Sequence, residues 1–352
     1  MKNFVFINSQ ERLPYFDFIR GVVIIMVVAI HTLSQCYVPE TLSIVGVAMR
    51  NVMNCAVPLF CACSAFFLIN EDLENGRYKN FLIRRISRVY IPCLFCGLPY
   101  FLSDVLSGEL FRKALVKYLT CFYGVFYFVA LIIQFYVLLP LFQKIKFLRN
   151  KWLGFGISFI WVGCYVYVVS TRTVVPLILY AGVIFCWWLY FAIGASCGME
   201  SDVNSRNRII LIALCVLSLI LSVIESYSRM DATDSLTGVG IKPSSLLFSF
   251  SVCLFVYGNN SRVLSSNNFI TRIIISLGRY SFGIYLVHLL LLSVFNKLAS
   301  IYSFTNIKIL GIYQGGGYKW LALTALILTI NYLCLVIAKR LFPKLTWWFL
   351  GV

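Results

Sequence analysis

Residues 16–36 read FDFIRGVVIIMVVAIHTLSQC, and they combine a long apolar stretch with two side chains that hydrocarbon tolerates poorly. Every residue between Arg20 and His31 is apolar or small. A helix of about 20 residues spans the hydrocarbon core of a bilayer, so we interpret this stretch as a transmembrane helix. The polar residues 1–13 before it, which carry both signs of charge, do not resemble a cleavable signal peptide, and we expect the helix to be retained.

Similar apolar runs recur along all 352 residues, of which 61% are hydrophobic and only 12% are charged. In hydrocarbon each backbone amide must find its partner locally, so these runs are expected to be helices. The sequence predicts an all-α, polytopic bundle in which residues 1–352 form a single transmembrane domain without a soluble accessory domain. The ten expected spans lie near 16–36, 46–69, 89–107, 126–143, 152–170, 176–198, 208–226, 243–260, 280–297 and 319–341.

The net charge of +17 comes from Lys and Arg that cluster in the short loops between apolar runs. This distribution is typical of topology signals in a membrane and argues against nucleic-acid binding. Most of these basic residues fall on one side of the membrane if the chain starts in the cytoplasm. We therefore expect both termini to be cytoplasmic, in a multi-pass protein of the bacterial plasma membrane that contacts lipids along its spans.

The 13 cysteines lie mostly inside apolar runs, where cysteine behaves as a small hydrophobic residue. Cys93 and Cys96 form a C-x-x-C inside an expected span, but no histidine lies nearby in the sequence. We therefore expect no metal site, no disulfide framework and no permanently bound cofactor.

The positions of the ionisable residues argue against a coupled transporter. All 13 Asp and Glu residues lie at or beyond the ends of the expected spans, whereas coupled transporters usually need carboxylates in mid-membrane. Both histidines of the chain, His31 and His288, fall inside expected spans. A histidine in the membrane usually faces an interior cavity, although interhelical hydrogen bonding is the simpler explanation.

Helix geometry places the polar residues of the first span on one face. Arg20 and His31 are 11 residues apart, which is about three turns and roughly 16 Å along the axis. Asp17 lies one turn before Arg20 and can pair with it. This face suits a long donor with an anionic end near Arg20 and a reactive end near His31.

Two further groups could belong to the same site. Arg85 and Arg88 are one turn apart before the third expected span, where they could bind phosphate or simply contact lipid headgroups. Ser281, Tyr285 and His288 share one helix face in the ninth expected span and could line the cavity of His31.

These residues resemble the acyltransferase-3 family of bacterial membrane acyltransferases, whose hallmark is Arg-x10-His in the first helix. Four other stretches resemble that family in the same order, although Ala65 replaces the family's usual glycine. They are residues 57–68 (VPLFCACSAFFL), 84–92 (RRISRVYIP), 127–141 (YFVALIIQFYVLLPL) and 281–288 (SFGIYLVH).

The resemblance implies transfer of an acyl group, commonly acetyl from acetyl-CoA as co-substrate, to a hydroxyl of a surface or lipid-linked carbohydrate. His31 is then the general base or a transient acyl carrier, and the three arginines Arg20, Arg85 and Arg88 bind the phosphates of the donor. The side chains expected to orient His31 or the oxyanion are Asn54, Ser64, Gln134 and His288. The competing class is a transporter or flippase for a lipid-linked sugar, which would use the histidines as a gate and need no CoA. The sequence identifies neither the acceptor nor the oligomeric state.

Overall fold

The computed structural model describes residues 14–36, 44–74, 76–171, 175–199, 208–228, 241–258, 268–301 and 317–352. Every regular element in these ranges is a helix, which confirms the predicted all-α class. The first half of the chain contains α1 (Pro14–Cys36), α2 (Ile44–Met53), α3 (Ala56–Leu68), α4 (Arg77–Leu106), α5 (Phe111–Leu119), η2 (Gly124–Phe126), α6 (Tyr127–Lys144), η3 (Lys146–Arg149) and α7 (Lys151–Ser170). The second half contains α8 (Leu177–Tyr180), α9 (Ile184–Met199), α10 (Arg208–Ser228), α12 (Pro243–Tyr257), α13 (Phe269–Arg279), α14 (Ser281–Ile301), α15 (Gly317–Leu341) and α16 (Pro343–Phe349).

The described helices account for all ten expected spans. Eight segments are long and apolar enough to cross a membrane, and the shorter apolar helices Ile184–Met199 and Pro243–Tyr257 lie where the other two spans are expected. Several connections that carry basic residues, such as 200–207 and 229–240, lie outside the described residues. The cytoplasmic location of both termini therefore stays a prediction.

Two expected spans are broken. The second span divides into α2 and α3 at Asn54 and Cys55, because the ring of Pro58 is incompatible with a regular helical bond to the carbonyl four residues earlier. The sixth span divides into α8 and α9 around Gly182, where Gln134 of α6 bonds the freed backbone groups. Interruptions of this kind are tolerated in membrane helices when neighbouring side chains satisfy the backbone.

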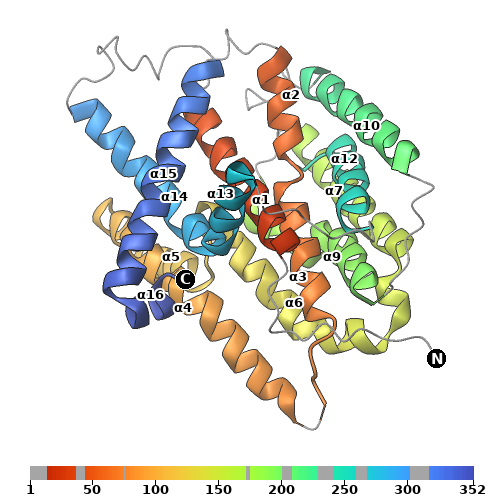
Figure 1. Cartoon of the computed structure of the whole chain (residues 1–352), viewed down its shortest axis with the longest axis horizontal. Helices are drawn as coiled ribbons and strands as arrows, with labels where there is room; N and C mark the ends of the chain where they lie inside the picture. The colour runs from red at the N-terminus through yellow and green to blue at the C-terminus, as the bar shows by residue number, and fades with distance from the viewer. Residues whose placement is uncertain are drawn as a thin grey trace.

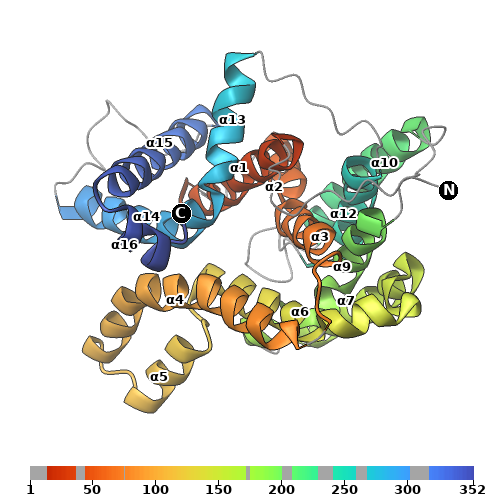
Figure 2. The same ribbon diagram turned by 60° about the horizontal axis from the view of Figure 1, so that its bottom comes forward.

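Helix α1 lies at the centre of the bundle (Figures 1 and 2). It packs against α2 and α3 on one side and against α13, α14 and α15 on the other. Helices α7, α9, α10 and α12 pack together beyond α3, and α4 runs across the bundle beside α6 and α16. A first helix enclosed in this way can hold polar side chains away from lipid.

Glycine allows two pairs of helices to approach at backbone contact. A Cβ atom at Gly278 of α13 would lie 1.8 Å from the carbonyl oxygen of Asp17, and one at Gly21 of α1 would lie 2.0 Å from that of Ile274. A Cβ at Gly194 of α9 would likewise lie 2.0 Å from the carbonyl oxygen of Ala62 in α3. Small residues commonly allow this packing in membranes, where helices gain little from the hydrophobic effect.

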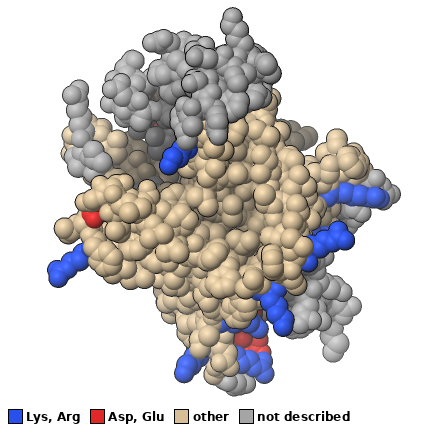
Figure 3. All heavy atoms as spheres, turned by 90° about the vertical axis from the view of Figure 1, so that its left-hand side faces the viewer, with Lys and Arg blue, Asp and Glu red and all other residues tan. Residues whose placement is uncertain are grey.

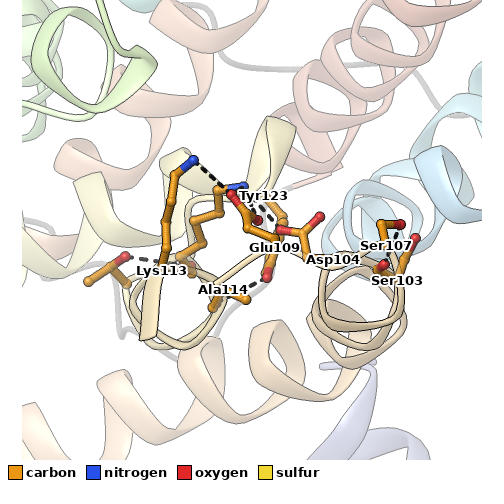
Figure 4. Close-up of polar contacts among 9 residues, drawn as sticks. Ser103, Asp104, Ser107, Glu109, Lys113, Ala114 and Tyr123 are labelled. Atoms are coloured by element: carbon orange, nitrogen blue, oxygen red, sulfur yellow. Dashed lines mark hydrogen bonds and ion pairs between the residues drawn. The ribbon is translucent and has the colours of Figure 1, made fainter. Parts of the chain in front are cut away.

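An ion-pair cluster closes the turn between α4 and α5 (Figure 4). Lys117 donates to Asp104 at 3.1 Å and to Glu109 at 2.6 Å, and Lys113 pairs with Glu109 at 2.9 Å. These hydrogen bonds lower the pKa of Glu109 to about 2, and the bond from Lys117 has a larger effect than the bond from Lys113. The cluster fixes α5, a helix that the sequence assigns to a loop because it is too short and too polar for a span.

Uncharged side chains cover most of the described surface on the side of α14 and α15, and the Lys and Arg side chains lie mainly toward its margins (Figure 3). Exposed apolar residues on these helices include Val294, Leu321, Leu333 and Ile337. An apolar surface of this extent fits contact with lipid, which is consistent with a multi-pass membrane protein.

Candidate active site

The predicted ion pair at the start of α1 is present and has a third member. Arg20 donates to Asp17 at 3.4 Å, and Arg279 of α13 approaches the other oxygen of the same buried carboxylate at 3.5 Å. The guanidinium of Arg20 also lies 5.1 Å from the ring centre of Phe67, in range of a cation–π contact. Sequence spacing revealed the Asp17 pair but not Arg279, which only the close packing of α13 on α1 brings there.

The two other predicted donor-binding arginines lie on a helix where the sequence suggests a loop. Helix α4 begins at Arg77, so Arg85 and Arg88 lie about two and three turns after its first residue. Arg85 forms an ion pair with Glu71, and the guanidinium of Arg88 lies 4.4 Å from the ring centre of Trp347.

The three arginines converge on one buried tyrosine. The charges of Arg85, Arg88 and Arg20 all act on the hydroxyl of Tyr136 in α6. Asp17 pairs with Arg20, and Glu71 pairs with Arg85. The structure therefore brings the predicted donor-binding residues together at one end of the bundle.

The structure also brings the two histidines together. The ring centres of His31 and His288 are 5.3 Å apart, and His288 is only 1% exposed. Helix α15 fixes the turns of α1 beside His31 through two hydrogen bonds. Trp320 donates to the carbonyl of Ala29 at 2.8 Å, and the hydroxyls of Thr32 and Thr324 are 2.7 Å apart.

The backbone selects the tautomer of His288. Its Nδ1 lies 2.8 Å from the carbonyl oxygen of Tyr285 and 3.0 Å from that of Ile284, and carbonyl oxygens can only accept. In the neutral ring Nδ1 therefore carries the proton, and Nε2 is a hydrogen-bond acceptor. This buried Nε2 has no hydrogen-bond partner among the described residues.

The remaining residues of the predicted face on α14 support this geometry. Tyr285 is buried and donates its hydroxyl to the carbonyl of Val125, and its ring centre lies 6.4 Å from that of His288. Ser281 is buried one turn before Tyr285. Tyr285 thus anchors the histidine face of α14 to η2.

Three other predicted residues occupy different places. Asn54 accepts a hydrogen bond from Arg50 and donates to Ser245 at the break between α2 and α3. Ser64 is half-buried on α3, next to Cys63, which lies against the guanidinium of Arg20. Gln134 donates to the carbonyl of Gly182 at 2.7 Å and accepts from the amide of Ile184 at 3.3 Å, so its side chain bridges α8 and α9.

We expect the change Gln134→Leu to lower the free energy of unfolding by about 1–3 kcal/mol, because it leaves two backbone groups without a partner. The measurement is the thermal unfolding midpoint of the purified protein in detergent. Ser170→Ala, at an exposed hydroxyl that ends α7, should leave the midpoint unchanged. A Gln134→Leu protein that melts like the wild type but turns over far more slowly would assign Gln134 to the reaction.

Comparisons with known proteins agree with the family resemblance. A family model described as "Acyltransferase domain" matches residues 13–338. The chain is also similar to the Bacillus subtilis protein named "Putative membrane-bound acyltransferase YfiQ", at 26% identity over 293 residues, which cover 77% of this chain and 78% of that protein. No solved structure matches the chain.

Proposed function

The chain belongs to the acyltransferase-3 family, and from that premise we propose that it moves an acetyl group from acetyl-CoA to a hydroxyl of a surface or lipid-linked carbohydrate. We place it in the bacterial plasma membrane. The observation that carries the proposal is the pairing of His31 with His288, about three turns along α1 from the arginine cluster. The similar Bacillus subtilis protein supports acyl transfer at a membrane by its name alone.

The histidine pair can perform the proton transfers of this reaction. The acceptor hydroxyl attacks the thioester carbonyl, and His31 takes its proton as the new carbon–oxygen bond forms. When the carbon–sulfur bond breaks, the same proton passes to the leaving thiolate. The fixed acceptor Nε2 of His288 can orient the N–H of His31 or the attacking hydroxyl. A transient acyl-histidine on His31 uses the same geometry.

The arginine cluster can hold the other end of the donor. Arg20 lies roughly 16 Å along α1 from His31, and its charge acts on Tyr136 together with those of Arg85 and Arg88. Coenzyme A carries its phosphates at one end and its thioester at the tip of a flexible arm. Guanidinium groups bind phosphate through charge-assisted hydrogen bonds, so the cluster suits the phosphates.

We expect Arg88→Gln to raise the KM for acetyl-CoA roughly 10- to 100-fold, since a hydrogen bond to a charged group contributes about 1.5–3 kcal/mol. Turnover at saturating donor should change much less, because the proposal assigns Arg88 to the phosphates of the donor and not to the reacting carbonyl. The measurement is initial rate against acetyl-CoA concentration, together with the rise in melting temperature that acetyl-CoA produces.

The matched control is Arg84→Gln on the same helix, where the side chain is 70% exposed and only approaches Glu71 at 3.7 Å. Its KM should stay near that of the wild type. Equal KM values for Arg88→Gln and Arg84→Gln would remove Arg88 from the donor site.

Binding of acetyl-CoA tests the proposed function against a transporter of lipid-linked sugars. A ligand that binds only the folded protein raises its melting temperature in proportion to its concentration over Kd. We expect acetyl-CoA to stabilise the wild type in this way and dephospho-CoA to stabilise it less. A protein whose melting temperature does not respond to any CoA derivative would favour the transporter.

A further inference from the structure

Arg50 is a half-buried charged residue that falls inside the second expected span, residues 46–69. It lies on α2, within the membrane-spanning segment Ile44–Leu68. One turn later, Met53 packs against Ala29 and Leu33, the neighbours of His31 on α1. Helix α2 therefore holds Arg50 beside the part of α1 that carries the candidate base.

The charge of Arg50 acts on groups of two helices near the histidine pair, α1 and α6. It acts on the ring of His31 and on the hydroxyl of Tyr127, the first residue of α6. The residues on either side of Tyr127, Phe126 and Phe128, pack edge-on against Tyr285. Tyr285 lies one turn before His288, so the charge of Arg50 acts close to the parts of α1, α6 and α14 that surround the histidine pair.

Among the described residues, the guanidinium of Arg50 donates one hydrogen bond and keeps one buried nitrogen without a partner. One terminal nitrogen donates to the side-chain oxygen of Asn54, whereas its buried Nε has no partner among the described residues. No described carboxylate lies within ion-pair distance of Arg50 either. A partly desolvated cation that lacks a carboxylate partner among the described residues costs folding free energy, so its presence suits a role toward an anionic ligand or transition state.

A buried polar network holds the partner of Arg50 in place. Asn54 donates to Ser245 at 3.3 Å, and Ser245 lies 3.2 Å from Ser222 of α10. Ser222 in turn donates to Asn51 at 2.7 Å, which links α10 back to α2.

The network ends at a second cation. Asn51 donates to Ser226 at 2.9 Å, and the ammonium of Lys242 donates to the hydroxyl of Ser226 and to the carbonyl of Ser222. All of these side chains are buried, so α2, α10 and α12 form one rigid support behind Asn54. A supported guanidinium needs little rearrangement when charge develops in front of it.

The reaction at the histidines requires a donor that His288 cannot supply. When a hydroxyl attacks the thioester carbonyl, the π electrons move to the carbonyl oxygen, which becomes an oxyanion. The free ring nitrogen of neutral His288 is the acceptor Nε2, which cannot donate, and His31 is occupied by the proton of the hydroxyl. Resting on the proposed acetyl transfer, we infer that Arg50 binds this oxyanion and is a catalytic residue of the site.

The test compares Arg50→Gln and Arg50→Lys with the wild type in membrane vesicles and in purified form. The probe is radiolabelled acetyl-CoA, and the readouts are label transferred to membrane glycans and CoA released by the slower hydrolysis with water. We expect Arg50→Gln to lower both rates by about 10²- to 10³-fold with an unchanged KM for acetyl-CoA. Arg50→Lys should recover part of the lost rate because it keeps the charge.

The melting temperature of the variants distinguishes a catalytic role of Arg50 from a structural one. Because Gln removes a half-buried charge that has no carboxylate partner among the described residues, Arg50→Gln should melt at the wild-type temperature or higher. A structural arginine would instead show a lower melting temperature and no recovery with Lys, and this result would overturn the inference. The matched control is Arg77→Gln, at an exposed ion pair with Asp72, which should match the wild type in every readout.

Three other outcomes also test the inference and the proposed function. An Arg50→Gln protein that keeps wild-type transfer rates contradicts the inference while the proposed function stands. Loss of transfer with an unchanged rate of hydrolysis would assign Arg50 to binding the acceptor and not to the oxyanion. If the folded wild type transfers no label at all, the proposed function itself fails.

Discussion

His31→Gln should lower acetyl transfer by about 10²- to 10⁴-fold, the usual contribution of a positioned general base. Glutamine keeps the approximate size of the side chain but cannot take up the proton of the acceptor hydroxyl. Binding of acetyl-CoA should persist, because the arginines expected to hold its phosphates lie about three turns away along α1. The measurement combines transfer rate with the shift in melting temperature at saturating acetyl-CoA.

The matched control for this variant is Ser34→Ala, one turn beyond His31 on the same helix. Ser34 is exposed and donates only to the carbonyl of Ile30, so its removal should leave the rate unchanged. Near-normal transfer by His31→Gln would reject His31 as the base. Acyl label that remains covalently bound to the wild type after rapid quenching, but not to His31→Gln, would identify the acyl-histidine route.

Gly278→Ala should destabilise the protein by about 1–3 kcal/mol and also weaken donor binding. The new Cβ would lie 1.8 Å from the carbonyl oxygen of Asp17, so the backbones of α1 and α13 must separate. That movement also shifts Arg279 away from the carboxylate that pairs with Arg20. The measurements are the unfolding midpoint and the KM for acetyl-CoA.

Gly163 of α7 provides the control, because a Cβ there meets no atom within 4 Å. Gly163→Ala should be neutral or stabilise the protein by up to about 1 kcal/mol through its higher helix propensity. If Gly278→Ala is as stable as Gly163→Ala, the close contact between α1 and α13 does not limit stability.

Although only eight of the ten expected spans are long enough to cross a membrane in the described part of the chain, the placement of the apolar helices was predictable because each depends only on a local apolar run. The short helices were not. Helix α13 has 11 residues and α5 has 9, both below the length that a search for spans detects. They are amphipathic elements whose positions depend on their partners, as in the packing of Gly278 on α1.

The candidate site was predictable where it follows helix geometry. The pairing of Asp17 with Arg20 is set by one turn of helix, and the structure confirms it. The approach of His288 to His31 was expected only as a shared cavity, because residues on distant helices meet through tertiary packing. For the same reason the sequence does not reveal that Arg279 approaches Asp17, or that Arg50 in the second expected span lies near the histidine pair.

Gln134 is the opposite case, a residue that the sequence suggests is functional and that the structure shows bonding to a helix break. Its polarity inside an apolar span suggests a functional residue, and the sequence offers no sign of the helix break at Gly182. The structure shows that its amide bonds both sides of that break. A polar residue in a membrane span can thus be required by the backbone of a neighbouring helix.

The central claim is that this protein transfers an acetyl group from acetyl-CoA at the histidine pair. The direct measurement uses purified wild type in nanodiscs, supplied with bacterial membrane glycans and radiolabelled acetyl-CoA. We predict that one CoA is released for each base-labile acetyl ester formed, and that His31→Gln forms almost none. Folded wild-type protein that neither releases CoA nor forms an ester, and whose melting temperature does not respond to acetyl-CoA, would contradict this account.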